Sequence, residues 1–136
     1  MKLKNSDEFQ DLISIIALQN NYFSIEKFIE SSYELRIQKI GSHYRAFKRI
    51  SYDWKINRST PMIEDVEMEP RYKIWVDECS KIFGGLDLLA LDVLVTQDGK
   101  EIILELNDTA AGMNYKDQED REYIKEVVID KMRSIK

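Results

Sequence analysis

Hydrophobic residues recur at helical spacing in three stretches of the chain. Asn5 and Glu8 fit a capping box, and the apolar residues after them predict a first helix over about residues 6–18. Pro70 suits the first turn of a second helix, which the Gly84–Gly85 pair would end. A third amphipathic stretch, from near Asp117 to about residue 132, predicts the last helix.

Other stretches alternate apolar and polar residues, as antiparallel strands do. Residues 33–40 and 43–50 predict one hairpin, and residues 86–107 predict another around Asp98–Gly99, a strong two-residue turn signal. The aromatic and isoleucine-rich segment Tyr22–Ile29 predicts one more strand, while residues 61–68 are ambiguous. This order predicts an α+β fold, an antiparallel sheet covered by helices, and we expect all three helices on one face of the sheet.

Carboxylates interrupt the apolar hairpin over residues 86–107. A two-residue loop would place Asp92 directly opposite Glu105, with Asn107 on the same face of the sheet. Facing like charges destabilise a strand pair unless something compensates them. Two carboxylates and an amide oxygen form a hard-oxygen cluster suited to Mg²⁺ or Ca²⁺. The alternative is a solvated sheet face, since antiparallel sheets often have one wet face.

Composition narrows the class of protein. The 136 residues suit one domain, and 43% hydrophobic residues suffice for a core. A formal net charge of −5 argues against nonspecific binding to nucleic acid or to anionic membranes. The single cysteine, Cys79, excludes an intrachain disulfide and favours a reducing compartment. No apolar run approaches the roughly 20 residues of a membrane span, so we expect a cytoplasmic domain.

Residue clusters point to nucleotide chemistry rather than to a histidine site. His43 is the only histidine and lies at a predicted turn, so we expect a surface residue rather than a member of a catalytic triad. The chain has no Walker-type glycine loop and no dinucleotide fingerprint. The basic segment 43–49 could meet phosphates, or could simply protect a hairpin edge. With the acidic hairpin and the apolar segment 22–30, it suggests metal, phosphates and adenine in one crevice.

Several segments closely resemble the synapsins in order and spacing. They are "IQKIGSHYRAFKRIS…WKIN", "RYKIWVDECSKIFGGLDLLALDVL", "ILELND" and "EDREYIKEVVIDKM", and the similarity extends back to "EFQDLISIIAL". Synapsins are ATP-binding phosphoproteins on the cytosolic face of synaptic vesicles, and their central domain resembles ATP-grasp enzymes. The resemblance therefore implies that residues 1–136 form the C-terminal half of an ATP-grasp fold, without the N-terminal Rossmann-like domain and the lid.

The resemblance also implies contacts to the base and the ribose. The segment "EKFIE" resembles the adenine hinge, which contacts the base largely through backbone atoms of Glu26, Phe28 and Ile29. Glu34 in "YELR" matches the position that often binds the ribose hydroxyls.

Positions for phosphate and metal follow from the same resemblance. Arg36, Lys48 and Arg49 match basic positions around the triphosphate, and Asn57 matches a loop residue on the phosphate or substrate side. The metal ligands of ATP-grasp proteins match Asp92, Glu105 and Asn107, in agreement with the hairpin register.

Three functional hypotheses follow. The first is an ATP-binding module, linked by family to vesicle clustering and regulation of neurotransmitter release. The second is a fragment of an ATP-grasp carboxylate-amine ligase, which would need an upstream phosphate loop and an acceptor pocket. The third is a purely structural remnant. We expect ATP with Mg²⁺ or Ca²⁺ as ligands, the missing half, a second copy or the vesicle membrane as partners, and weak ATP binding by this chain alone.

Overall fold

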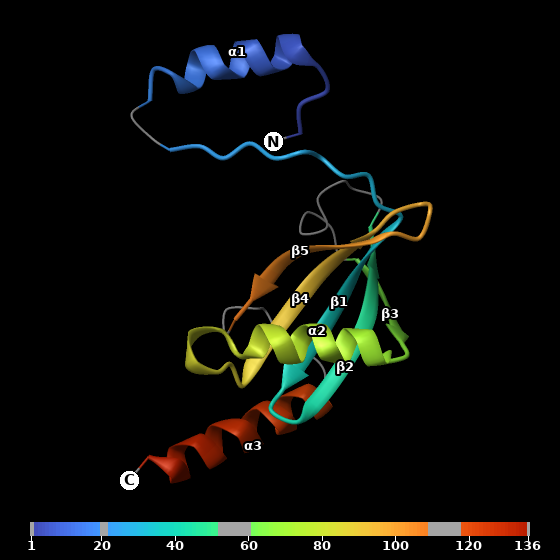
Figure 1. Cartoon of the computed structure of the whole chain (residues 1–136), viewed down its shortest axis with the longest axis vertical. Coiled ribbons are helices and arrows are strands. Elements are labelled where there is room, and N and C mark those ends of the chain that lie inside the picture. Colours follow the sequence, from blue (N-terminus) through green and yellow to red (C-terminus); the bar gives the residue numbers. More distant parts are fainter. Residues whose placement is uncertain (1, 20–21, 52–60, 109–117, 136) are drawn as a thin grey trace.

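A five-stranded antiparallel sheet forms the centre of the computed structural model, which describes residues 2–19, 22–51, 61–108 and 118–135. The strand order is β3-β2-β1-β4-β5 (Figure 1). The strands are β1 (Tyr33–Ile40), β2 (His43–Ile50), β3 (Met62–Val66), β4 (Leu88–Val95) and β5 (Glu101–Asn107). The predicted α+β class and both predicted hairpins are confirmed, and the ambiguous residues 61–68 contain the edge strand β3.

The three predicted helices form with nearly the expected bounds. They are α1 (Ser6–Ile16), α2 (Pro70–Ser80) and α3 (Gln118–Ser134), with a short 3₁₀ turn, η2 (Ile82–Gly84), after α2. Asn5 caps α1 because its side chain accepts a hydrogen bond from the Glu8 N–H at 2.9 Å. The helix was predicted to reach residue 18, but it ends at Ile16, with Ala17 as its C-cap.

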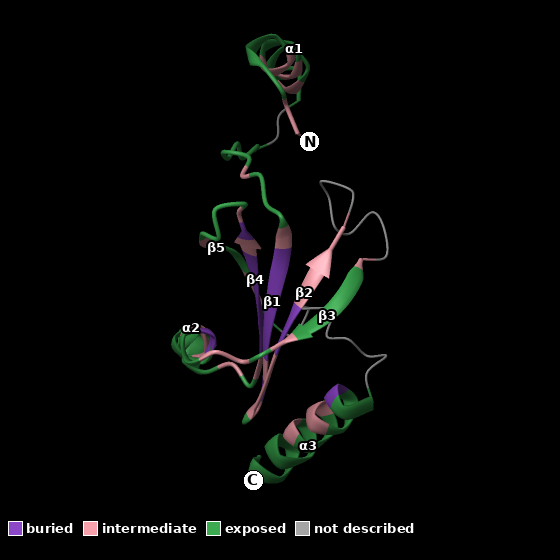
Figure 2. Cartoon of the chain, turned by 90° about the vertical axis from the view of Figure 1, so that its right-hand side faces the viewer, coloured by how far each residue is buried: buried purple, intermediate pink, exposed green. Residues whose placement is uncertain are grey.

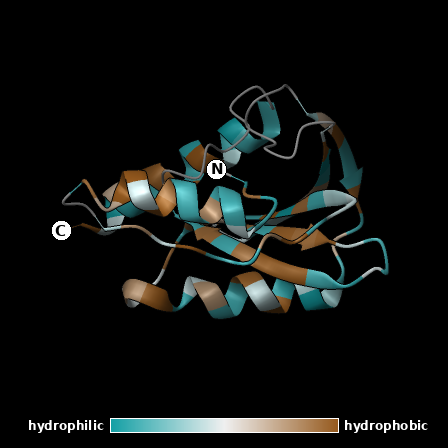
Figure 3. Cartoon of the chain, turned by 90° about the horizontal axis from the view of Figure 1, so that it is seen from above, coloured by the Kyte–Doolittle hydropathy of each residue, from teal (hydrophilic) through white to brown (hydrophobic). Residues whose placement is uncertain are grey.

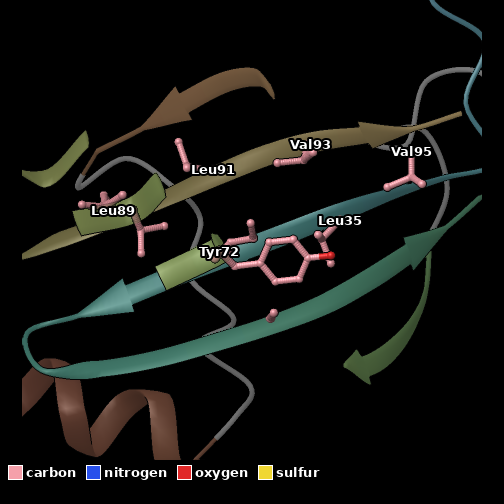
Figure 4. Close-up of a cluster of buried hydrophobic side chains, with 9 residues drawn as sticks. Leu35, Tyr72, Leu89, Leu91, Val93 and Val95 are labelled. Carbon is pink, nitrogen blue, oxygen red and sulfur yellow. The ribbon is translucent and has the colours of Figure 1, made fainter. Parts of the chain in front are cut away.

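The hydrophobic core lies between α2 and one face of the sheet (Figure 4). Tyr72 and Val76 of α2 pack there against strand residues that are almost completely buried. These strand residues are Leu35, Ile37, Ala46, Leu89, Leu91, Val93 and Val95. Seen from above, the middle of the sheet is largely hydrophobic, while the helices carry both hydrophobic and hydrophilic residues (Figure 3). We call this side of the sheet the core face.

The expectation that all three helices cover one face is wrong. Figure 2 shows α2 and α3 on opposite sides of the sheet, and α1 lies beyond its end. No residue of α1 is buried, and Asp120 is the buried residue of α3. Instead, α3 contacts the β1–β2 turn: a Cβ at Gly41 would lie 2.7 Å from Val127 Cγ2. His43, expected at the surface, is partly buried because its ring stacks on Tyr123 with centroids 3.4 Å apart.

The segment Tyr22–Ile29, predicted as a strand, is not one. It is described without strand pairing, and it leads into β1, whose two edges are already taken by β2 and β4. A strand needs a neighbouring strand to pair with its backbone N–H and C=O groups. The edge strands of the sheet are β3 and β5, and Tyr22–Ile29 pairs with neither. Aromatic and isoleucine content alone therefore misled the prediction.

The β4–β5 hairpin has the predicted pairing at Asp92, but its loop differs from the prediction and it contains a bulge. The loop is longer than two residues: Val95 faces Glu101, and the Thr96 N–H donates to the Lys100 carbonyl at 3.0 Å. A register shift between Asp92 and Val93 then restores the predicted pairs, so Asp92 faces Glu105. The extra residue is Leu104, a β-bulge that re-aims the end of β5.

Candidate functional site

A large open groove, about 1660 Å³ in volume, lies over the other face of the sheet, which we call the groove face. Its walls are α1 and the extended segment Phe23–Ser32, and its floor comes from β1, β2, β4 and β5. Every predicted site residue that the structure describes, except Lys48, lines this groove. They are Glu26, Phe28, Ile29, Glu34, Arg36, Arg49, Asp92, Glu105 and Asn107.

Asp92 stands at the centre of a buried charge network on the groove floor. Arg36 and Asp92 are cross-strand partners, and Arg36 Nη1 donates to the two carboxylate oxygens at 2.7 and 3.0 Å. Arg49 Nη2 lies 3.0 Å from Asp92 Oδ1 and also pairs with Glu34, its own cross-strand partner. Two arginines and two acids thus compensate one another, which buried charges require if they are not to destabilise the fold.

Asn107 joins this network to Glu105. Its Nδ2 donates to Asp92 Oδ2 at 3.0 Å and to Glu105 Oε1 at 3.2 Å, so the three predicted metal ligands converge. Glu105 is exposed and Asn107 is partly buried, whereas Asp92 is only 3% exposed. The site therefore has one deep carboxylate and one at the surface, with an amide between them.

The converging groups match a hard divalent cation in chemical type, because their carboxylate and amide oxygens are the ligands that such a cation takes. The Asn107 amide nitrogen lies between the two carboxylates, and rotation about its terminal bond would present the amide oxygen there instead. Among the described residues, no group of three or more His, Cys, Asp or Glu side chains is arranged to hold a metal. Two carboxylates and one amide are too few ligands for Mg²⁺ or Ca²⁺, so phosphate oxygens or water would have to complete the shell.

Lys48 does not join Arg36 and Arg49. It faces Leu35 across the strands and lies on the core face, at the rim. Its Nζ is 3.6 Å from Glu64 Oε1 and 5.1 Å from the centroid of the Tyr33 ring. The structure thus places this predicted phosphate ligand on the face of the sheet opposite to Arg36 and Arg49. Asn57, the remaining predicted residue, lies outside the described residues.

The predicted adenine hinge forms the groove wall next to α1. Glu26 and Phe28 are exposed, and Ile29 is partly buried. Lys2 Nζ lies 3.7 Å from the centroid of the Phe28 ring, a cation–π contact that ties the N-terminal residues to this segment. An extended backbone that pairs with no described strand is compatible with base contacts through main-chain atoms.

Some groove residues were not recognised from the sequence. The apolar side of α1 lines the groove, although its spacing had placed it in the core; the residues are Phe9, Leu12, Ile13 and Ile16. Periodicity reveals such a side but not the surface that it faces. Gln38, which lies on the same face of the sheet but does not line the groove, was also missed: it is fully buried two residues after Arg36, and its side-chain amide has no hydrogen-bond partner in the described part of the chain. The alternation of "YELRIQKI" could have placed it on this face.

Sequence comparison places the chain in a family. The family model described as the synapsin ATP-binding domain matches residues 1–134. The chain belongs to the synapsin family. It is 36% identical over 141 aligned residues to "Synapsin" of Drosophila melanogaster, an alignment that covers 98% of this chain and 14% of that protein. This synapsin-family chain thus spans a small part of its relative.

Solved structures with a similar fold include ATP-grasp ligases and a macrocyclase. A RiPP-associated ATP-grasp ligase of Chryseobacterium gregarium, in complex with ADP and a leader and core peptide, has a TM-score of 0.67 and 21% identity, covering 96% of this chain and 42% of that one. The ligase PsnB, complexed with a precursor variant, Mg and ADP, has a TM-score of 0.66 and 16% identity, covering 95% and 42%. The macrocyclase MdnC from Microcystis aeruginosa, bound to a precursor peptide, has a TM-score of 0.58 and 23% identity, covering 76% and 34%.

These likenesses show an ATP-grasp-like fold for the synapsin-family chain, as the resemblance implied. At such low identity they show nothing about its ligands.

Within the described residues, no helix is both long and apolar enough to span a bilayer.

Proposed function

We propose that this synapsin-family chain is an ATP-binding module that supplies one side of a nucleotide site. The base would lie along Glu26–Ile29, with Glu34 near the ribose. The phosphates would lie over Arg36 and Arg49, and Mg²⁺ or Ca²⁺ would be held by Asp92, Glu105 and Asn107. The observation that carries the proposal is the convergence of these residues in one groove around the Arg36–Asp92–Arg49 cluster.

The chemistry of the groove floor suits a polyphosphate. Guanidinium groups present several fixed N–H donors that match phosphate oxygens, and their hydrogen bonds to charged acceptors are among the strongest in proteins. When bound, the divalent cation would neutralise phosphate charge. The chain's own carboxylates, Asp92 and Glu105, would face that cation, and the apolar side of α1 would close the far wall of the groove.

Binding by this chain alone should be weak. Each missing charge-assisted hydrogen bond removes about 1.5–3 kcal/mol. Two missing contacts from the rest of an ATP-grasp fold would therefore weaken binding by roughly two to four decades. We expect millimolar rather than micromolar affinity for ATP, which calls for a method that detects weak binding.

Amide chemical shifts in the ¹⁵N-labelled chain test the proposal during titration with ATP and Mg²⁺. Shifts should concentrate at residues 26–29 and at Arg36, Arg49 and Asp92. Arg36→Gln should weaken the response by about tenfold or more, because it removes a charged phosphate ligand. Arg45→Gln is the matched control, since Arg45 lies on the same face but pairs with Asp65 and Asp120 outside the groove. Saturable shifts centred on Arg45, or equal effects of the two variants, would contradict the proposal.

A role in synaptic vesicle clustering and neurotransmitter release extends the proposal beyond the groove. Family membership supports it, and it would place the protein on the cytosolic face of vesicles. Co-sedimentation of the chain with purified synaptic vesicles tests the association. Binding that is lost on addition of excess unlabelled chain would support it, and equal sedimentation with and without vesicles would refute it.

The alternative function is that of a carboxylate-amine ligase fragment. The likeness to ATP-grasp ligases and the Asp92–Glu105–Asn107 set favour it. ADP release in the presence of carboxylate and amine acceptors distinguishes the two hypotheses. A binding module should release no ADP above the level of an Asp92→Asn variant, whereas acceptor-dependent release would favour the ligase.

A further inference from the structure

The deep carboxylate of the proposed metal site already has a cationic partner. We propose that Arg36 occupies the cation position at Asp92, so that a divalent ion can bind there only after nucleotide phosphates have drawn Arg36 away. The inference rests on the proposed function of the groove and adds a fixed order of binding, with phosphate before metal.

The geometry around Asp92 leaves no free place for a metal. Oδ1 accepts from Arg36 at 2.7 Å and lies 3.0 Å from Arg49 Nη2. Oδ2 accepts from Arg36 at 3.0 Å and from Asn107 at 3.0 Å. A carboxylate oxygen has about two lone-pair directions, so each oxygen of Asp92 is fully engaged. A metal must displace at least one of these donors.

Burial makes Arg36 and a metal ion mutually exclusive. Both side chains of the Arg36–Asp92 pair are 5% exposed, and charges interact far more strongly at such sites than in water. A divalent ion added beside Arg36 would face an unscreened like charge. Without Asp92, the proposed site keeps one exposed carboxylate and one amide, which is a poor ligand set for Mg²⁺ or Ca²⁺.

Nucleotide phosphates could remove this block. They offer Arg36 a charged acceptor of the kind that guanidinium groups bind most strongly. Arg49 also pairs with Glu34, so it can release Asp92 and remain compensated. Phosphate binding would then expose the Asp92 oxygens, and phosphate and metal affinities would rise together by the same factor. A rise in the concentration of the divalent cation alone would leave the nucleotide-free chain without a bound cation.

Paramagnetic Mn²⁺ tests this order in the ¹⁵N-labelled chain, because it broadens the amide signals of nearby residues. In the wild type, Mn²⁺ alone should leave the signals of Asp92, Glu105 and Asn107 sharp, and Mn²⁺ with a non-hydrolysable ATP analogue should broaden them. In Arg36→Gln, Mn²⁺ alone should broaden them at about 10- to 100-fold lower concentration than in the wild type, the equivalent of one charged hydrogen bond. Adding Asp92→Asn to Arg36→Gln should abolish that gain.

Two further variants complete the design. Arg45→Gln removes an arginine of the groove face that does not contact Asp92, and it should behave as the wild type. Arg49→Gln removes a single contact to Asp92 from a more exposed side chain, so it should shift Mn²⁺ binding in the same direction by less. This variant keeps the test decisive if Arg36→Gln does not fold.

The outcomes distinguish failure of the proposed competition by Arg36 from failure of the proposed metal site. If wild type and Arg36→Gln respond alike to Mn²⁺ alone, Arg36 is no competitor and the inference is wrong, while the proposed metal site stands. If no variant shows broadening at these residues even with the ATP analogue, both the metal site and the inference fail.

Discussion

Leu91 and Asp92 are neighbours on β4 that point to opposite faces of the sheet, and both are almost completely buried, at 0% and 3% exposure. On the core face, burial removes apolar surface from water and stabilises the fold by about 25 cal/mol per Å². On the groove face, burial covers Arg36, Asp92 and Glu34, and a buried ion pair contributes little net stability. Burial on the core face is favourable in itself, whereas burial of charged groups on the groove face requires another reason, such as a ligand.

The two faces also differ in the burial and hydrogen bonding of their uncharged and charged polar side chains. On the core side, Lys39 and Tyr44 both reach Asp77, at 2.7 and 2.8 Å, from partly exposed positions at the rim. On the groove face, Gln38 is fully buried and its amide has no described hydrogen-bond partner. Natural proteins accept such unfavourable groups mainly where function requires them. Substitutions on one face at a time test this difference between the two faces.

The largest effect is expected from removing the central carboxylate. Asp92→Ala leaves the buried Arg36 and the partly buried Arg49 without the acid that they share, which should cost about 3–5 kcal/mol of unfolding free energy. Urea unfolding followed by circular dichroism measures this loss. Asp87→Ala is the control, because Asp87 forms an exposed ion pair with Lys131 that should contribute about 0–1 kcal/mol. A loss below about 1 kcal/mol for Asp92→Ala would show that the network is not compensated as described.

The next effect is a recovery of unfolding free energy, no larger than the loss caused by Asp92→Ala. Replacing both members of a buried ion pair with apolar residues of similar volume is often neutral or stabilising. The double variant Arg36→Met with Asp92→Leu should therefore regain most of the stability that Asp92→Ala loses, since Arg49 keeps Glu34. The same urea experiment measures the gain, and the amide titration should show that ATP binding is lost. A double variant no more stable than Asp92→Ala would mean that the charges are needed for folding itself.

Much of the contrast between the core face and the groove face was predictable, because strand alternation can be read from neighbouring residues in the sequence. The pattern of residues 86–107 placed Asp92, Glu105 and Asn107 on one face, and the structure confirms that pairing. Two errors cancelled in that prediction, since the loop is longer than expected and a bulge at Leu104 compensates for it. The pairing of β1 with β4, which brings Arg36 to Asp92, joins residues 56 positions apart and cannot be seen in a local pattern.

Other errors have equally physical causes. Neighbouring strand residues point to opposite faces, so Lys48 and Arg49 lie on different faces of the sheet. The resemblance grouped them by position in the sequence, whereas alternation alone would have separated them. The apolar stripes of α1 and α3 were assigned to one core because a stripe shows that a helix packs without showing what it packs against.

A smaller effect should come from Gln38. A buried polar group without a partner costs about 1–3 kcal/mol, so Gln38→Met, which keeps the length of the side chain, should stabilise the chain by about 1 kcal/mol. Gln97→Met is the control, because Gln97 is exposed at the β4–β5 loop and its substitution should change stability by less than about 0.5 kcal/mol. Thermal or urea unfolding of both variants measures the difference. Destabilisation by Gln38→Met would mean that the amide contributes to the fold.

The last effect belongs to the core face and is absent at neutral pH, because it appears only at alkaline pH. Burial, together with a 2.6 Å hydrogen bond to Glu101, raises the pKa of Tyr72 to about 12. The unfolded chain releases this proton near pH 10. The stability that Tyr72 contributes is thus fully present below about pH 10 and is lost as the pH rises towards about 12. Tyr72→Phe should flatten this part of the pH dependence of the unfolding free energy, measured by urea unfolding at successive pH values. Tyr22→Phe, at a fully exposed tyrosine, should leave it unchanged. An equal slope in wild type and Tyr72→Phe would place the alkaline transition elsewhere in the molecule.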